Sequence, residues 1–252
     1  MNNQFDFQQF WSMNFQSILN YENLLDYIND DDALRIFTNK MGYRINDDGG
    51  YEHIPLDSED RGDWHKYTKS NLTQTVNVMN NQIIVYMATI VETSMYDFFL
   101  CIFKKEPNRI LSLTQLFDDG IADLGFSFSD FLKYESKDDY INEMANRASQ
   151  KCNSGKIKSV FKRIKDITGL QIPNTISNAI IELVRLRNEI VHERITHDLK
   201  YDILKSYSDE LEKLLFSLAI KVYELNINVN DPGDLLGLNE YTEDEVLSNE
   251  VK

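Results

Sequence analysis

The sequence predicts an all-α protein. Only 4 Pro and 10 Gly occur in 252 residues, and residues that favour helix are frequent throughout the chain. Apolar residues recur along most of its length with the spacing of amphipathic helices. Hydrophobic residues make up 42% of the chain, which is enough to bury a sizeable core. We therefore expect a helical bundle in one main domain and no sheet-dominated fold.

The first 66 residues are predicted to form an N-terminal extension of helices and a loop. Residues 5–41 have helical spacing and many aromatic side chains, and an acidic cluster near residue 30 can cap the start of a second helix. Residues 46–64 are rich in Asp, Gly and Ser, and the run from Asp47 to Gly50 is a strong turn signal. This second part is therefore predicted to be a loop or a short hairpin.

A long helix over residues 69–104 is the predicted centre of the main domain, which we place at residues 67–227. Its longest apolar run, residues 83–103, is interrupted by polar side chains, of which Glu92 and Asp97 are charged. These interruptions favour a buried core helix over a membrane span, because charged groups are costly in a bilayer. We expect no membrane partner.

The rest of the main domain is predicted to be helical as well. Gly169 and Pro173 end one of its helices. From Asp231 onward seven acidic residues stand against one Lys, so residues 228–252 are predicted to form an acidic, flexible tail. The predicted elements after the long helix are short helical pieces over residues 107–131 and helices over residues 137–152, 156–168, 174–195 and 199–225.

The formal net charge of -15 argues against a protein that coats nucleic acid nonspecifically, since such binding depends on many Lys and Arg contacts to phosphate. Any RNA would have to meet a local basic surface. The helix over residues 156–168 offers one, because its polar side is basic and it directly precedes the helix over residues 174–195. The candidate RNA-binding residues are Lys156, Lys158, Lys162, Arg163 and Lys165.

Two cysteines, Cys101 and Cys152, lie far apart and lack metal-ligand spacing. The chain also carries no glycine-rich phosphate loop and no nucleophile elbow. We therefore expect no metal and no cofactor. The cysteine usage and the lack of an apolar leader favour a cytoplasmic location.

Candidate chemistry lies in one segment of the helix over residues 174–195, which reads Arg187-Asn188-Glu189-Ile190-Val191-His192. An always-charged guanidinium and a titratable imidazole suit binding or cleavage of a phosphodiester. The segment resembles the signature of the HEPN superfamily, in particular the RiboL-PSP-HEPN and abortive-infection type. In many RNA-cleaving members of that superfamily an Arg and a His separated by four to six residues form the site, often with Asn directly after the Arg.

The resemblance covers mainly residues 69–225. It implies a HEPN-like helical bundle, to which the N-terminal helices and the acidic tail are additions. It also implies an endoribonuclease with Arg187, Asn188 and His192 as catalytic residues, acting as a homodimer. Family association suggests a microbial toxin-antitoxin, abortive-infection or other antiviral defence system, with an antitoxin or regulatory protein as a further partner.

Helix geometry leaves two choices for the site arginine. On a straight α-helix Arg187 falls within the apolar face and diverges from His192 by about 140°. Arg185, by contrast, shares the opposite stripe with Asn188 and His192. In one alternative, a distorted turn lets the side chain of Arg187 bend toward His192. In the other, Arg185 is the cation of the site and Arg187 stabilises the core. The other members of the apolar face are Ile176, Ile180, Leu183, Ile190 and Val191.

A buried Arg187 would need an acceptor, and Glu92 on the long helix is the candidate. The resemblance also implies that Glu92 is the acceptor, because related HEPN sequences carry an acidic residue in a comparable core helix. The alternative is that Glu92 faces solvent. His197, five residues beyond His192, is predicted to be a cation at the end of the helix, near its C-terminal dipole.

The predicted chemistry needs no metal, because RNA carries its own nucleophile in the 2′-OH. His192 would accept that proton, and an Arg would stabilise the charge on the phosphate. A second proton donor would come from the His192 of a partner in a two-fold dimer, whose seam we place at Ile181, Arg185, Asn188 and His192. The alternative function is a non-catalytic HEPN-like module that binds another protein, through the N-terminal aromatic region or the acidic tail.

Overall fold

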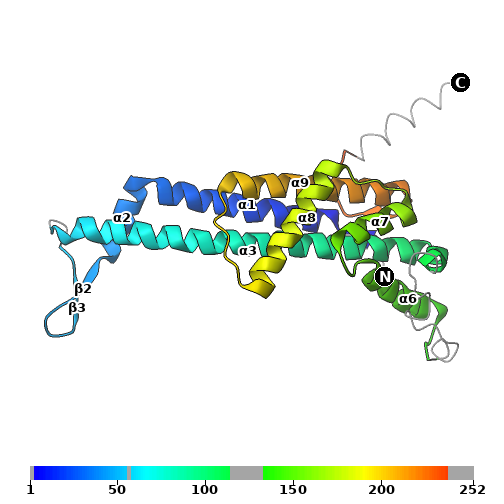
Figure 1. The fold of residues 1–252 in the computed structure, drawn as a ribbon, viewed down its shortest axis with the longest axis horizontal. Helices are drawn as coiled ribbons and strands as arrows, with labels where there is room; N and C mark the ends of the chain where they lie inside the picture. The colour runs from blue at the N-terminus through cyan, green and yellow to red at the C-terminus, as the bar shows by residue number, and fades with distance from the viewer. Residues whose placement is uncertain (1–2, 56–57, 114–132, 238–252) are drawn as a thin grey trace, which may run out of the picture.

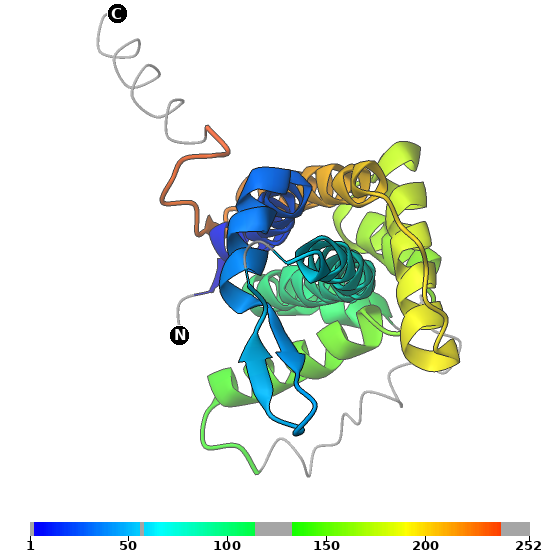
Figure 2. The same ribbon diagram turned by 90° about the vertical axis from the view of Figure 1, so that its left-hand side faces the viewer.

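The computed structural model describes residues 3–55, 58–113 and 133–237, which form an elongated helical bundle around one long helix (Figure 1). That helix, α3 (Asp60–Lys105), runs along the length of the molecule, and Figure 2 shows the other helices arranged round it. The predicted all-α class is confirmed. The surrounding helices are α1 (Phe7–Asn29), α2 (Asp31–Met41), α6 (Lys137–Cys152), α7 (Ile157–Thr168), α8 (Asn174–Asn188) and α9 (Tyr201–Glu224).

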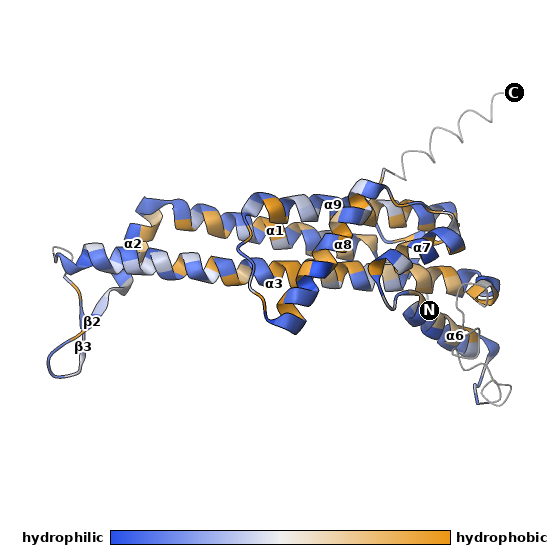
Figure 3. Ribbon diagram, viewed as in Figure 1, coloured by the Kyte–Doolittle hydropathy of each residue, from blue (hydrophilic) through white to orange (hydrophobic). Residues whose placement is uncertain are grey.

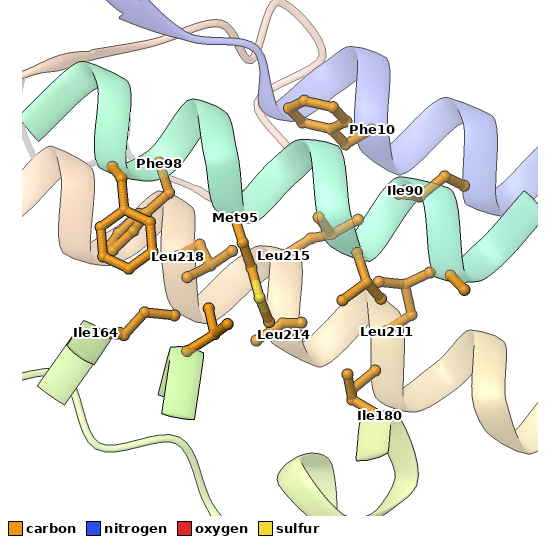
Figure 4. Packing of buried hydrophobic residues seen from close by; sticks show 14 of the residues in the cluster. Phe10, Ile90, Met95, Phe98, Ile164, Ile180, Leu211, Leu214, Leu215 and Leu218 are labelled. Atoms are coloured by element: carbon orange, nitrogen blue, oxygen red, sulfur yellow. The ribbon is translucent and has the colours of Figure 1, made fainter. Parts of the chain in front are cut away.

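The core lies where α3 meets α1, α8 and α9, whose buried apolar residues form one cluster. Figure 3 shows hydrophobic and hydrophilic residues alternating along these helices. Met95 of α3 is fully buried among leucines of α9, and Ile164 of α7 and Ile180 of α8 belong to the same cluster (Figure 4). By length and composition α3 could cross a membrane, but 56% of its most apolar window is buried inside the protein. This supports the predicted core helix.

The start of α3 differs from the prediction by nine residues. The helix begins at Asp60, whereas apolar periodicity placed its start at residue 69. Its first turns are polar and are held by hydrogen bonds to other segments, which the spacing of apolar residues cannot predict. Arg61 is buried and donates to the carbonyl oxygens of Thr38 and Ile54, so it ties this end of α3 to α2 and to the segment that precedes α3.

Two helices precede α3, as predicted, and the carboxylate of Asp30 caps the second by accepting the N–H groups of Asp32 and Ala33, at 3.0 Å each. The predicted loop or hairpin is an antiparallel hairpin of β2 (Tyr43–Ile45) and β3 (Tyr51–His53). The domain boundary drawn at residue 66 falls inside α3. In addition, α1 packs against both α3 and α9, so it belongs to the central bundle.

The segment predicted as a flexible tail starts as packed structure. β4 (Asn228–Val229) pairs in parallel with β1 (Gln4–Phe5), because the fully buried Phe5 anchors the N-terminal segment beside it. Asp231 then accepts the N–H groups of Leu235 and Leu236. Residues 238–252 lie outside the described part of the chain.

The remaining boundaries agree closely with the sequence pattern. α6 spans the predicted residues. α7 ends at Thr168 and is capped by Gly169, whose φ of 77° is the left-handed conformation that glycine adopts readily. After α3 comes a short 3-10 helix, η1 (Pro107–Ser112). The other short helical pieces predicted up to residue 131 fall among residues 114–132, which the structure does not describe.

Candidate active site

The motif helix changes its geometry inside the motif. α8 ends at Asn188 and continues as a π-helical turn, η3 (Glu189–Glu193), in which the N–H of Arg194 donates to the carbonyl of Glu189, five residues back. Arg194 then adopts the left-handed conformation with φ 58°, so the helix ends at Glu193, two residues before the predicted end at Ile195. A π turn is wider than an α turn, so it reduces the angular divergence expected between Arg187 and His192.

Arg187 lies at the entrance to this turn and is bonded on two sides. Its Nη1 donates to Oδ1 of Asn188 at 3.0 Å, and its Nη2 lies 3.4 Å from Oε2 of Glu92 on α3. The predicted pairing with Glu92 is therefore present. The side chain is 25% exposed, so Arg187 occupies the edge of the apolar face rather than its buried centre. Its Nε is buried without a hydrogen-bond partner.

Arg185, the alternative site arginine, is engaged by carboxylates of its own helix. Its Nε and Nη2 donate to Glu182 at 2.8 and 2.5 Å, and its Nη1 donates to Glu189. The hydrogen bonds that Arg185 donates to Glu182, followed by the one that it donates to Glu189, raise the pKa of Arg185, and the pKa of Glu182 is lowered in return. All three guanidinium nitrogens are occupied, and none of these bonds goes to Asn188 or His192.

His192 lies on the π turn with an exposed side chain that makes no hydrogen bond or ion pair to the part of the chain that the structure describes. In the predicted seam Ile181 is half-buried, and Arg185, Asn188 and His192 are exposed. Val191, predicted to lie on the apolar face, is 46% exposed. The straight-helix projection, which placed Val191 on the buried face, is therefore wrong for this residue.

His197 does not lie at the end of the helix, where the sequence predicted it. The helix has already ended, and Nε2 of His197 lies 3.1 Å from Oε2 of Glu189, within ion-pair distance but without hydrogen-bond geometry. The backbone of His197 is bonded to Asn81 of α3. Sequence reasoning missed Asn81, although two adjacent Asn residues within a helix of apolar periodicity are a signal that could have identified it.

The predicted basic strip on α7 divides into two groups. Lys156, Lys158, Lys162 and Lys165 are exposed, as an RNA-binding surface requires. Arg163 instead turns toward the end of α6, where its Nη1 donates to the carbonyls of Cys152 at 2.9 Å and Ser154 at 2.6 Å. Burial lowers its pKa. Arg163 therefore joins two helices, and the lysines form the accessible part of the strip.

The two cysteines are not candidate nucleophiles. Both are buried as free thiols, and burial raises the pKa of each to about 12. A thiol with such a pKa is almost fully protonated near neutral pH, whereas the nucleophile is the thiolate. Within residues 3–55, 58–113 and 133–237 no group of three or more His, Cys, Asp or Glu side chains is placed to hold a metal ion.

Comparison with known proteins identifies the bundle that carries this site. The sequence matches the RiboL-PSP-HEPN family over residues 63–224, which is more than half of the chain. The match extends from α3 to the end of α9 and so includes Glu92, Arg187 and His192. No curated protein and no solved structure gives a significant match. The chain belongs to the RiboL-PSP-HEPN family.

Proposed function

We propose that the protein is a metal-independent endoribonuclease in which Arg187, Asn188 and His192 act on the scissile phosphodiester. The observation that carries this proposal is the contrast between the two arginines. Arg185 has all its nitrogens bonded to carboxylates, whereas Arg187 has one long contact to a carboxylate and one bond to a neutral amide. A guanidinium carries five N–H donors, so Arg187 retains donors for a phosphate.

His192 is the general base of the proposed reaction. Its exposed imidazole would accept the proton of the ribose 2′-OH, whose oxygen attacks the adjacent phosphorus, and the bond to the 5′-oxygen breaks. Arg187 would stabilise the negative charge that develops on the non-bridging oxygens. Asn188, which accepts a hydrogen bond from Arg187, would fix the direction of the guanidinium.

The departing 5′-oxygen needs a proton, and a second copy of the chain would supply it. One histidine cannot conveniently accept one proton and donate another in the same step. In a two-fold dimer the His192 of one protomer would act as base and that of its partner as acid. The exposure of Asn188 and His192 on the surface of the bundle supports a seam that includes this turn.

RNA would reach the site along the exposed lysines of α7, the helix that packs against α8. Lysines bind phosphates without reading sequence, so this strip would hold the strand while the site around His192 cleaves it. Family association further supports a role in a cytoplasmic toxin-antitoxin, abortive-infection or antiviral defence system.

A second candidate function is a module that binds another protein, such as an antitoxin or a regulator. The observation in its favour is a set of exposed apolar side chains on α2, the hairpin and the first turns of α3. The hairpin projects from this end of the molecule (Figure 1). Tyr51 is 81% exposed, and Ile45, its partner across the hairpin, is 67% exposed. Exposed apolar side chains, where they form a contiguous patch, are typical of an interaction site. The others are Ile36, Phe37, Tyr43 and Tyr67.

Incubation of the purified protein with single-stranded and structured RNA in excess EDTA tests the first function. Cleavage is expected from the wild type, and its loss is expected in His192→Ala and Arg187→Ala. Arg194→Ala, which removes an exposed arginine just after the π turn, is the matched control and should cleave normally. No cleavage by the wild type, or equal cleavage by all four proteins, would contradict the enzymatic function and favour the binding module.

A further inference from the structure

Asn81, a side chain of the core helix α3, holds the loop that follows the π turn. We propose that Asn81 is a positioning residue for His192, an inference that rests on the proposed function. Asn81 is 6% exposed and lies 111 positions before His192 in the sequence. It does not need to touch RNA, because its effect would pass through the backbone that carries the imidazole.

Two hydrogen bonds fix the loop to this one side chain. Oδ1 of Asn81 accepts the N–H of His197 at 2.9 Å, and Nδ2 donates to the carbonyl of His197 at 3.0 Å. Residues 194–200 form no helix or strand, so their backbone groups need other partners. An amide that binds both backbone groups of one residue fixes its position and its orientation.

The ring of His197 reaches back to the first residue of the π turn. Its Nε2 lies 3.1 Å from Oε2 of Glu189, and Oε1 of Glu189 accepts from Arg185. His192 lies between Glu189 and His197 in the chain. The turn that carries the imidazole is therefore held at its start by Arg185 on α8, and the loop that follows it is held at His197 by Asn81 on α3.

The neighbouring residue strengthens the same attachment. Asn80 is 2% exposed, and its Nδ2 donates to the carbonyl of Leu199 at 2.6 Å. Two adjacent side chains of α3 thus bind the loop at positions two residues apart, which prevents it from sliding along the helix. A π turn is a rare conformation, and the hydrogen bonds of Asn80 and Asn81 to the following loop would stabilise it at the end of α8.

A buried asparagine that merely stabilises the fold would behave differently, and the chain provides a matched control. Asn14 of α1 is 3% exposed, and its Nδ2 donates to the carbonyl of Ser208 on α9 at 3.0 Å. It joins two helices through a buried amide, as Asn81 joins a helix and a loop, but its partner Ser208 lies on neither α8 nor the π turn. Loss of either amide removes comparable bonds.

The test compares wild type, Asn81→Ala, Asn14→Ala and His197→Ala, each at a temperature where it is fully folded. RNA cleavage is followed over a full substrate range, and backbone hydrogen exchange is followed by mass spectrometry. Asn81→Ala should lower kcat by about 10–100-fold with little change in KM, because a small displacement of a catalytic group is costly. Exchange over residues 189–199 should be faster. Asn14→Ala should change neither.

His197→Ala removes the ring that faces Glu189 but retains the backbone hydrogen bonds to Asn81, so it should lower kcat less than Asn81→Ala does. If Asn81→Ala does not fold, His197→Ala tests the positioning role in its place. Wild-type kcat in Asn81→Ala, or in His197→Ala in that event, overturns the positioning role. An equal loss of kcat in Asn14→Ala also overturns it, because the effect would then be one of general stability. A wild type that cleaves no RNA is a separate outcome that overturns the proposed function itself.

Discussion

The guanidinium of Arg187 on α8 and the carboxylate of Glu92 on α3 form an ion pair, with Nη2 3.4 Å from Oε2. The two residues lie 95 positions apart in the chain. The pair connects the core helix to the entrance of the π turn, and it leaves the guanidinium able to bind an anion. Both the stability of this junction and the proposed catalysis therefore involve the same two side chains.

Removal of the Glu92 carboxylate should affect activity more than stability. The two side chains are 25% and 42% exposed, and such pairs contribute at most about 1 kcal/mol. Glu92→Ala should therefore unfold at nearly the wild-type urea concentration, yet its kcat/KM should fall by about tenfold, because the guanidinium loses its orientation. Glu92→Gln, which retains an acceptor oxygen, should keep most of the activity. Full activity in Glu92→Ala would contradict this role.

The two arginines should separate clearly in kinetics. Arg187→Ala should lower kcat/KM by about 100–1000-fold, the range found when one donor to a developing oxyanion is removed. Arg185→Ala should lower kcat/KM far less, since its guanidinium is already bonded to Glu182 and Glu189 and acts only by holding the start of the π turn. Initial rates on one RNA substrate decide between them. The reverse order of the two variants would assign the site to Arg185.

The lysines of α7 should contribute to RNA affinity in a salt-dependent manner. His192→Ala is used as the background so that bound RNA is not cleaved, and fluorescence anisotropy is recorded over a range of salt concentrations. The added changes Lys158→Gln and Lys162→Gln should weaken binding similarly for all sequences. For each lysine that binds a phosphate, its removal should reduce the slope of log K against log salt by about 0.7 for single strands. If the slope of log K against log salt does not change, RNA does not bind at the lysines of α7.

Arg163 should act on stability instead. Its bonds to the carbonyls of Cys152 and Ser154 would be removed in Arg163→Ala, and bonds from a charged donor are worth about 1.5–3 kcal/mol. The free energy of unfolding in urea should fall by an amount of that order. Lys162→Ala, on the exposed side of the same helix, is the control and should stay within about 0.5 kcal/mol of wild type.

The buried thiols give a prediction about pH. Burial raises the pKa of Cys101 and Cys152 from 9.0 to about 12, so between these values the folded protein binds more protons than the unfolded chain. Their contribution to stability is complete below pH 9 and is lost as the pH rises toward 12. Iodoacetamide at about pH 8.5 should therefore label both thiols slowly in the native protein and rapidly in urea, where the thiolate is accessible. Equal rates would contradict their burial.

Much of the architecture could be predicted because it depends on local chemistry. Apolar spacing predicted helices at α6, α7 and α9 to within two residues, and the acidic cluster at Asp30 predicted the break between α1 and α2. The start of α3 was missed because it depends on the buried Arg61, whose partners lie outside the helix. The packed start of the supposed tail was missed because it depends on pairing with Phe5.

The sequence by itself determined the fold class, the family and the identity of the candidate residues, since residue types and their spacing are enough for each. Only the tertiary structure distinguished the two arginines, because Glu92 approaches Arg187 from another helix while Glu182 and Glu189 occupy Arg185. It also revealed the π turn and its attachment to Asn81. Projection on a straight helix could not show these, because a backbone distortion held by long-range hydrogen bonds leaves no periodic signal in the sequence.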